Sequence, residues 1–301
     1  SIQAEPTPSP TPSPSEANLT AWVVTDSFYS IVNIRKTPDI SDDDSILPTF
    51  LHDRDEVLCT GESSTDSEGN TWVEIVIDQG TGYVLADFLV QEQPKSVPEA
   101  LNEGVLYDGV FTQLVPVESL SSNIIIDLTL ADENNFISDY ASDPSVGALY
   151  SHEIALIQYT TGLKLAAAAQ KFSQDGYQLV LWDAYRPYSV TVAMYDVIND
   201  PKLIADPSKG SKHNRGAAVD VTLYKDGEMV NMPTDDRVMD VSAASRTSYM
   251  STEQREMMDY LTDVMTSCGF STYRNEWWHF NDSDWGIYPL MDFPLSLFTG
   301  Q

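Results

Sequence analysis

The sequence predicts an α+β protein with two folded parts: a small β-barrel, then a larger α+β domain in which we expect a central antiparallel sheet. Residues 19–92 contain short strand-like runs separated by turn residues, which is typical of a barrel. Residues 104–301 alternate helical and buried-strand patterns. Residues 93–103 between them are polar and contain two prolines, which suits a linker. A chain of 301 residues is long enough for this organisation.

Residues 1–18 precede the first strand-like run and alternate proline with serine or threonine. Such a segment cannot build a core and favours extended conformations. It predicts a disordered tail. We further expect it to act as a tether to the cell envelope, which would make the protein extracytoplasmic, either secreted or anchored.

The charge and the cysteines set further limits. A formal net charge of -30 argues against binding to nucleic acid, because phosphate contacts need clusters of lysine and arginine. Cys59 and Cys268 fall in different predicted domains, and the sequence does not decide whether they pair.

The first folded part contains three ordered signatures, VNIRKTP at 32–38, GNTWVEI at 69–75 and GYV at 82–84. Together they resemble a bacterial SH3 domain. The resemblance implies a possible contact with peptidoglycan peptides, while a role as a spacer or as an intramolecular lid remains open.

The second folded part begins at residue 104, and its elements follow from periodicity, apolar runs and turn residues. Gly269 ends the helix predicted over 252–268, and Pro187 precedes the shorter helix predicted over 190–198. We expect the tail 289–298 to lie over the surface. In chain order we expect a helix over 154–173, a strand over 178–182, a helix over 190–198, a strand over 217–224, a helix over 252–268 and an irregular strand over 273–280.

Two short segments of this part contain the residues with the clearest chemistry. His213 precedes Asp220 by seven positions, and Glu276 precedes His279 by three. Two histidines and one aspartate can supply three ligands to Zn²⁺ and leave a fourth position for water. Glu276 then remains to move protons for that water.

Strand geometry constrains how these residues could meet. In a strand over 217–224, Asp220 lies on the face opposite the apolar Val219 and Val221, so it could point into a cleft. Glu276 and His279 would lie on opposite faces of a regular strand, so a bulge is needed if both are to face one metal. Taken singly, Asp220 could be a turn or cap carboxylate and His279 a core histidine.

The wider sequence context resembles a known enzyme family. The signatures SxHxxGxAxD, starting at Ser211, and ExxH, starting at Glu276, resemble those of zinc peptidases that cleave wall peptides containing D-amino acids. The longer context is similar to the D-alanyl-D-alanine dipeptidases of the vancomycin-resistance type. The matching segments are NF at 135–136, LWDAYRP at 181–187, DVTLY at 220–224, SCGF at 267–270 and EWWHF at 276–280.

The resemblance implies roles for individual residues. His213, Asp220 and His279 would bind zinc. Glu276 would act as general base and then as acid to the leaving amine. Arg186 would stabilise the oxyanion, with a structural salt bridge to Asp183 as the alternative reading. Further candidates for substrate binding are Ser211, Tyr185 and Trp278.

The chain departs from the family at two positions. Leu130 stands where the family usually has a tyrosine, and Asp236-Arg237 stands where it has Phe-Asp. The family residues help to hold the amino group of the substrate. We expect Asp236 or Asp235 to take over that contact, because a buried ammonium needs a paired anion.

These observations predict a zinc-dependent enzyme that hydrolyses D-Ala-D-Ala. Two alternatives stay open: a D,D- or L,D-carboxypeptidase acting on longer muropeptides, and a non-catalytic wall-binding protein. Two histidines have no place in this scheme. We expect His52 at the surface of the first part and His152 at a helix start.

Overall fold

The computed structural model describes residues 19–133, 135–137, 147–234 and 244–299. The chain divides into two compact units, residues 1–96 and 97–301. In the described ranges no helix has the length and the apolar character needed to cross a membrane.

Unit 1 is a seven-stranded sheet with antiparallel pairings. Among the described residues the pairings run in one path, in the order β3-β2-β6-β5-β4-β1-β7. Its core contains the fully buried side chains of Val23, Ile34, Ile75 and Val84. The strands are β1 (Leu19–Val23), β2 (Ile31–Arg35), β3 (Ile46–His52), β4 (Glu56–Thr65), β5 (Thr71–Ile77), β6 (Gly80–Leu85) and β7 (Leu89–Val90).

The predicted linker 93–103 is helical in its second half. Helix α1 (Val97–Glu103) belongs to unit 2, and its Leu101 is fully buried. Pro98 lies in the first turn, where its missing N–H costs no hydrogen bond. Pro98 therefore marks the start of a helix, and the second half of the predicted linker is not a flexible segment.

Unit 2 is built on a six-stranded sheet in the order β11-β13-β14-β17-β16, with β15 added to β14. Every pairing in it is antiparallel except that of β11 with β13. The expected central antiparallel sheet is therefore present, with one parallel pair that was not expected. A parallel pair needs a long crossover, and the chain between β11 and β13 includes helix α3 (Tyr159–Gln174). The strands are β11 (Ile124–Ile126), β13 (Gln178–Asp183), β14 (Ala218–Lys225), β15 (Glu228–Met229), β16 (Phe270–Tyr273) and β17 (Glu276–Asp282).

Four shorter strands complete unit 2 in two separate pairs. β8 (Val105–Tyr107) pairs with β9 (Val110–Thr112), and β10 (Leu114–Pro116) pairs with β12 (Leu156–Gln158).

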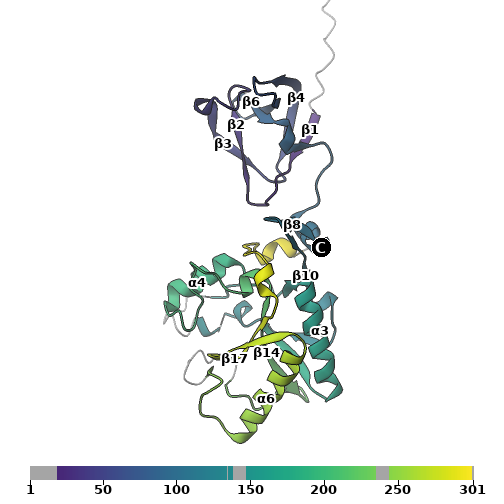
Figure 1. Ribbon diagram of the computed structural model, residues 1–301, viewed down its shortest axis with the longest axis vertical. Coiled ribbons are helices and arrows are strands. Elements are labelled where there is room, and N and C mark those ends of the chain that lie inside the picture. The colour runs from purple at the N-terminus through teal and green to yellow at the C-terminus, as the bar shows by residue number, and fades with distance from the viewer. Residues whose placement is uncertain (1–18, 134, 138–146, 235–243, 300–301) are drawn as a thin grey trace, which may run out of the picture. The chain divides into compact units, whose positions relative to one another are not determined.

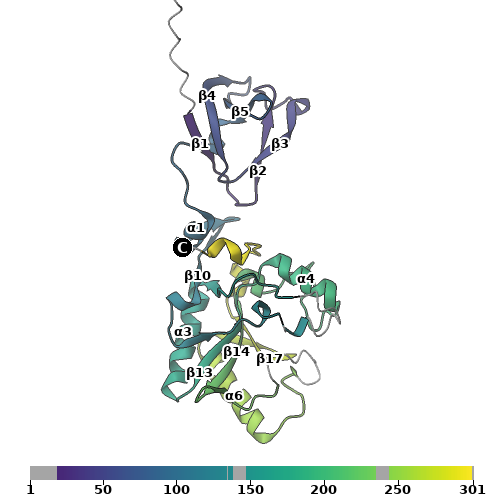
Figure 2. The same ribbon diagram turned by 180° about the vertical axis from the view of Figure 1, so that it is seen from behind.

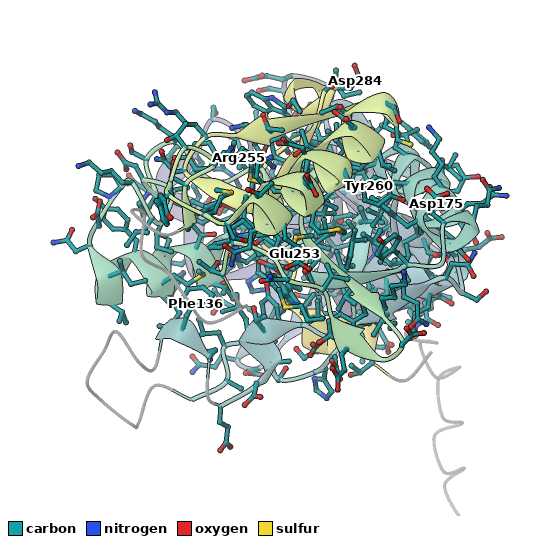
Figure 3. All side chains as sticks on the ribbon, turned by 90° about the horizontal axis from the view of Figure 1, so that it is seen from below. Phe136, Asp175, Glu253, Arg255, Tyr260 and Asp284 are labelled. Atoms are coloured by element: carbon teal, nitrogen blue, oxygen red, sulfur yellow. The ribbon has the colours of Figure 1, made fainter. Side chains whose placement is uncertain are left out.

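Three longer helices accompany the sheet: α3 (Tyr159–Gln174), α4 (Tyr188–Ile198) and α6 (Thr252–Ser267). Figures 1 and 2 show α3 and α4 at opposite sides of this unit. Helix α6 begins with a capping box formed by Ser251 and Gln254. Its Tyr260 donates a hydrogen bond of 2.6 Å to Asp175 at the end of α3, and both residues are labelled in Figure 3. The contact ties α6 to α3.

Several expected elements differ in detail. The helix expected over 154–173 starts at Tyr159, because Leu156–Gln158 pair with β10 as β12. His152 therefore lies in an exposed segment before β12 and not at a helix start. The irregular strand expected over 273–280 is a hairpin of β16 and β17. His52 is exposed at the end of β3, as predicted.

The C-terminal tail is more buried than expected. Met291 and Phe293 are each 1% exposed, and Phe293 accepts and donates hydrogen bonds with the Tyr185 hydroxyl. Met291, Phe293, Leu295 and Phe298 of this tail therefore belong to the core of unit 2, whereas Leu297 is exposed.

Candidate active site

His213 begins a short 3-10 turn, η5 (His213–Arg215), which closes at Gly216 with a φ of 64°. A side chain is strained at that φ, which explains the glycine. The ring of His213 is buried, and its Nδ1 lies 2.7 Å from the Ala184 carbonyl oxygen. A carbonyl can only accept, so Nδ1 carries the proton and donates. The Nε2 lone pair is then available to a metal.

Asp220 and His279 are brought together by the pairing of β14 with β17, in which they are direct partners. The Asp220 Oδ1 lies 2.9 Å from His279 Nδ1. On the other side of the ring, His279 Nε2 lies 2.8 Å from the Asn281 Oδ1, which accepts its proton. The hydrogen bond to Asn281 leaves Nδ1 as the atom that can ligate a metal.

Glu276 reaches the same place because β17 is bulged. Thr272 pairs with Phe280, whereas its neighbour Tyr273 pairs with Glu276. The extra residues on β17 rotate the strand between Glu276 and His279, so that both side chains line one cavity. The Glu276 Oε2 lies 3.6 Å from His279 Nδ1. The irregularity that the spacing required is therefore present.

The three predicted ligands have the separations of a metal site. His213 Nε2 lies 3.2 Å from His279 Nδ1 and 3.4 Å from Asp220 Oδ1. Asp220 Oδ1 and His279 Nδ1 are 2.9 Å apart. In a tetrahedral site with metal–ligand bonds of about 2.0–2.1 Å, two ligand atoms are roughly 3.3 Å apart. The three distances between the predicted ligand atoms are close to that value. Within the part of the chain that the structure describes, His213, Asp220 and His279 form a cluster that could hold a metal ion. The donor set of two imidazoles and one carboxylate fits Zn²⁺.

The two carboxylates differ in their protonation. Burial alone would raise the pKa of Asp220, but His213 and His279 beside it hold that pKa well below its usual range. Burial raises the pKa of Glu276 to about 7, and negative Asp220 adds to this, while His279 and Arg186 act in the opposite direction. The Asp220 carboxylate thus stays ionised and available to a metal, and the Glu276 carboxyl can exchange a proton near neutral pH.

Arg186 lies in the same cavity and is fixed by Asp183. Its Nε and Nη2 donate hydrogen bonds of 2.9 and 2.5 Å to the Asp183 Oδ2. The other oxygen, Oδ1, accepts from the Tyr150 hydroxyl at 2.7 Å and from the Ala184 N–H at 3.0 Å. Burial alone would lower the pKa of Arg186, but Asp183 and Tyr150 keep it above its ordinary value. Arg186 therefore forms the salt bridge with Asp183 and also lines the cavity.

A cavity of about 190 Å³ opens over these residues. That is smaller than the roughly 300–1,000 Å³ of typical drug-sized sites, which favours a small ligand. Ser211 and Trp278 line it, as predicted for substrate binding. Tyr185 does not contribute to the lining formed by the described residues. It is buried, and its hydroxyl is occupied by the Phe293 backbone. These contacts of its hydroxyl are structural, and the predicted substrate contact stays a prediction.

The remaining predicted positions have different outcomes. Asp235 and Asp236, with Arg237, lie outside the described residues. Leu130 is 1% exposed and packs in the core, so it does not widen the cavity.

Sequence reasoning missed Asn281 and the Ala184 carbonyl, which orient the two histidines. Asn281 follows His279 by two positions and shares its strand face, a signal that could have identified it. A backbone carbonyl gives no such signal.

Comparison of the sequence with known proteins places the chain in a family. The sequence profile of peptidase family M15, described as D-ala-D-ala dipeptidase, matches residues 111–294. The chain is similar to the D-alanyl-D-alanine dipeptidase of Escherichia coli strain K12, with 30% identity over 189 residues that cover 62% of this chain and 93% of the relative. It is also similar to those of Enterococcus faecium, at 30% over 46% of this chain and 78% of the relative, and Enterococcus faecalis, at 31% over 40% and 71%.

Proposed function

The chain belongs to the M15 family of D-ala-D-ala dipeptidases, and on this basis we propose that it hydrolyses D-Ala-D-Ala with the help of Zn²⁺. The observation that carries the proposal is one cluster of His213, Asp220 and His279 with the Glu276 carboxylate 3.6 Å from a ligand atom. The M15 family consists of metallopeptidases. The two imidazoles and one carboxylate of the cluster are a set of ligands that fits zinc.

The protein residues divide the chemistry between them. Zn²⁺ held by the three ligands would polarise the peptide carbonyl and lower the pKa of water. Glu276 takes a proton from the attacking water and returns it to the leaving amine, which a pKa near neutrality allows in both directions. Arg186, held in place by Asp183, provides a fixed positive charge for the oxygen that becomes negative.

The substrate is a small peptide, and its two ends need partners. For the amino group, Asp235 or Asp236 remains the proposed anion. Their contribution is measured by replacing both with Asn and comparing KM for D-Ala-D-Ala with KM for an N-acylated peptide that lacks the charge.

The test of the proposed function is product identity. The holoenzyme is incubated separately with D-Ala-D-Ala and with a pentapeptide that ends in D-Ala-D-Ala, with L-Ala-L-Ala as control. We expect each molecule of D-Ala-D-Ala to give two D-alanines, and we expect little hydrolysis of the pentapeptide. Release of one D-alanine from the pentapeptide, with the dipeptide left intact, would replace the dipeptidase by a carboxypeptidase on longer muropeptides.

We also propose that unit 1 is a bacterial SH3 domain that contacts peptidoglycan and that the protein works outside the cytoplasm. The support is the order of the signatures at 32–38, 69–75 and 82–84, which fall mainly on β2, β5 and β6 of one antiparallel sheet. Cosedimentation of unit 1 with purified peptidoglycan tests the contact. Recovery of all the protein in the supernatant would leave unit 1 as a spacer.

A further inference from the structure

Asn214 directly follows the predicted metal ligand His213, yet neither the metal site nor the proton transfer uses it. It stands at one of the variable positions of the SxHxxGxAxD signature that starts at Ser211. Its side chain is fully buried, and it is not among the described residues that line the catalytic cavity. Burying an amide is costly unless the amide is hydrogen-bonded, so its partners indicate what it does.

The Asn214 side chain bonds to three separate segments of unit 2. Its Nδ2 donates hydrogen bonds of 2.8 Å to the Arg186 carbonyl oxygen and 2.9 Å to the Thr191 Oγ1. Its Oδ1 accepts a hydrogen bond of 2.7 Å from the Ser211 N–H. A carbonyl oxygen can only accept and an N–H can only donate, so these partners fix which way the amide points. A carboxylate of the same shape could not make the first two bonds.

The bond to Arg186 completes a pair of main-chain contacts. The Arg186 N–H donates a hydrogen bond of 3.1 Å to the His213 carbonyl oxygen. Asn214 donates to the Arg186 carbonyl oxygen. Both main-chain polar groups of Arg186 are therefore held by the turn η5, which carries His213. Asn214 thus cross-links two segments that are distant in the sequence, the one that follows β13 and the one that precedes β14.

These two segments carry groups that must act on the same oxygen atom. In the proposed reaction His213 helps to hold the metal that polarises the peptide carbonyl, and Arg186 faces the oxygen as it becomes negative. Asp183 fixes the guanidinium of Arg186, but both residues belong to one segment, so their salt bridge cannot hold that segment against His213. A displacement of about 1 Å between catalytic groups can cost about 100-fold in rate. The cross-link therefore acts on a distance that matters to the rate.

We propose that Asn214 is a positioning residue that holds Arg186 in place against His213, so that the guanidinium lies where the oxyanion develops. This inference rests on the proposed function and adds to it a residue that acts only through Arg186. The hydrogen bond to Thr191 is a separate link, because it reaches helix α4. That link anchors the amide in the core, and it provides a control for the stability that Asn214 contributes.

The test is a double-mutant cycle on the zinc-saturated enzyme. Values of kcat and KM for D-Ala-D-Ala are measured for wild type, Asn214→Ala, Arg186→Met and the double variant. Thr191→Val is the matched control, because it removes the bond to α4 at an equally buried position and leaves the bond to Arg186 intact.

Zinc affinity and melting temperature are measured for every variant, to separate a loss of metal or of folding from a loss of rate. If Asn214→Ala does not fold, Asn214→Asp replaces it, since the carboxylate keeps the shape and the bond from Ser211 but cannot donate to Arg186. Arg186→Lys replaces Arg186→Met on the same ground.

We expect Asn214→Ala to reduce kcat by about 10- to 100-fold and to change KM by less than about threefold, because contact with the oxyanion exists only in the transition state. In the Arg186→Met background the same substitution should change kcat by less than about threefold, since no guanidinium remains to be positioned. Thr191→Val should keep kcat within about threefold of the wild type even if it lowers the melting temperature. An unchanged kcat in Asn214→Ala, equal losses in the two backgrounds, or the same loss in Thr191→Val would overturn the proposal.

A failure of the proposed function would look different. If the wild type cleaves only the pentapeptide, the dipeptidase assignment falls, and the cycle is measured on the pentapeptide with the same criteria. If it cleaves neither peptide, the cycle is measured by calorimetry with a phosphinate analogue of D-Ala-D-Ala, whose tetrahedral anion imitates the oxyanion. Asn214→Ala should then weaken binding of the phosphinate by about 10-fold or more, and it should have little effect in the Arg186→Met background. Equal weakening in both backgrounds would overturn the proposal.

Discussion

Asp220 and His279 are direct partners across β14 and β17, and their side chains meet at 2.9 Å. The register of one strand pair thus sets the separation of two predicted metal ligands. His213 adds the third ligand from a turn, at 3.2 Å from His279. Because the main chain sets this geometry, the site is preorganised for a metal, and its properties can be tested residue by residue.

We predict that His213→Ala loses most of its bound metal, because only two ligands would remain. The measurement is zinc per chain after dialysis against buffer without metal. His52→Ala is the matched control, since His52 is exposed in unit 1. Full zinc occupancy in His213→Ala would show that His213 is not a ligand.

We predict that Glu276→Gln keeps its metal and loses activity by about 10²- to 10⁴-fold, the range for a general acid or base. The amide has nearly the shape of the carboxylate but cannot accept the proton. Glu256→Gln, an exposed position on α6, should retain wild-type activity. If Glu276→Gln lost zinc, Glu276 would be a ligand. An unchanged kcat would assign the proton transfer to another group.

We predict that Asn281→Ala weakens zinc binding by about 10- to 100-fold, the usual effect of removing a group that orients a metal ligand. Asn281 accepts the Nε2 proton of His279 and thereby fixes which nitrogen faces the metal. Competition with a chelator gives the affinity. Asn123→Ala changes an exposed asparagine of unit 2 and serves as control. Equal affinities in the two variants would remove Asn281 from the metal site.

We predict that a chain starting at residue 95 folds, binds zinc and cleaves D-Ala-D-Ala at the wild-type rate. Unit 2 has its own buried core and contains all three ligands, Glu276 and Arg186. The comparison is kcat/KM of the full and the shortened chain. A shortened chain that carries zinc but has no activity would mean that unit 1 supplies part of the active site.

We predict that Asp66 stabilises unit 1 in a pH-dependent way. Desolvation alone would raise the pKa of Asp66, but hydrogen bonds from Trp72, Asn70 and Glu68 lower it. A pKa lowered in the folded state means that the stabilisation is present above the unfolded value of about 3.9 and is lost as the pH falls through the folded value.

Asp66→Ala should therefore increase amide exchange in β5 at pH 7, and its difference from the wild type should shrink as the pH falls below about 4. Glu62→Ala removes an exposed carboxylate of β4 as the control. A difference that stays constant from pH 7 to pH 3 would contradict the titration.

The sequence predicted the chemistry of the site better than its surroundings. The cluster of His213, Asp220 and His279 was predicted because the chain has only four histidines and because two of them lie near carboxylates at a specific spacing. The bulge in β17 was predicted because a regular strand cannot direct residues 276 and 279 to one side. The burial of Tyr185 was not predicted, because a sequence does not show which way a side chain points.

Five consecutive residues at the end of β13, Trp182 to Arg186, have a consequence for how this enzyme can change. Within them Ala184 orients His213, Asp183 fixes Arg186, and Tyr185 anchors the C-terminal tail. A substitution here would disturb the hydrolytic machinery and the core together, so this stretch has little freedom to vary. Lys202, in contrast, is an exposed residue of the cavity wall. Selection for a different peptide would therefore alter that wall first and leave the catalytic residues unchanged.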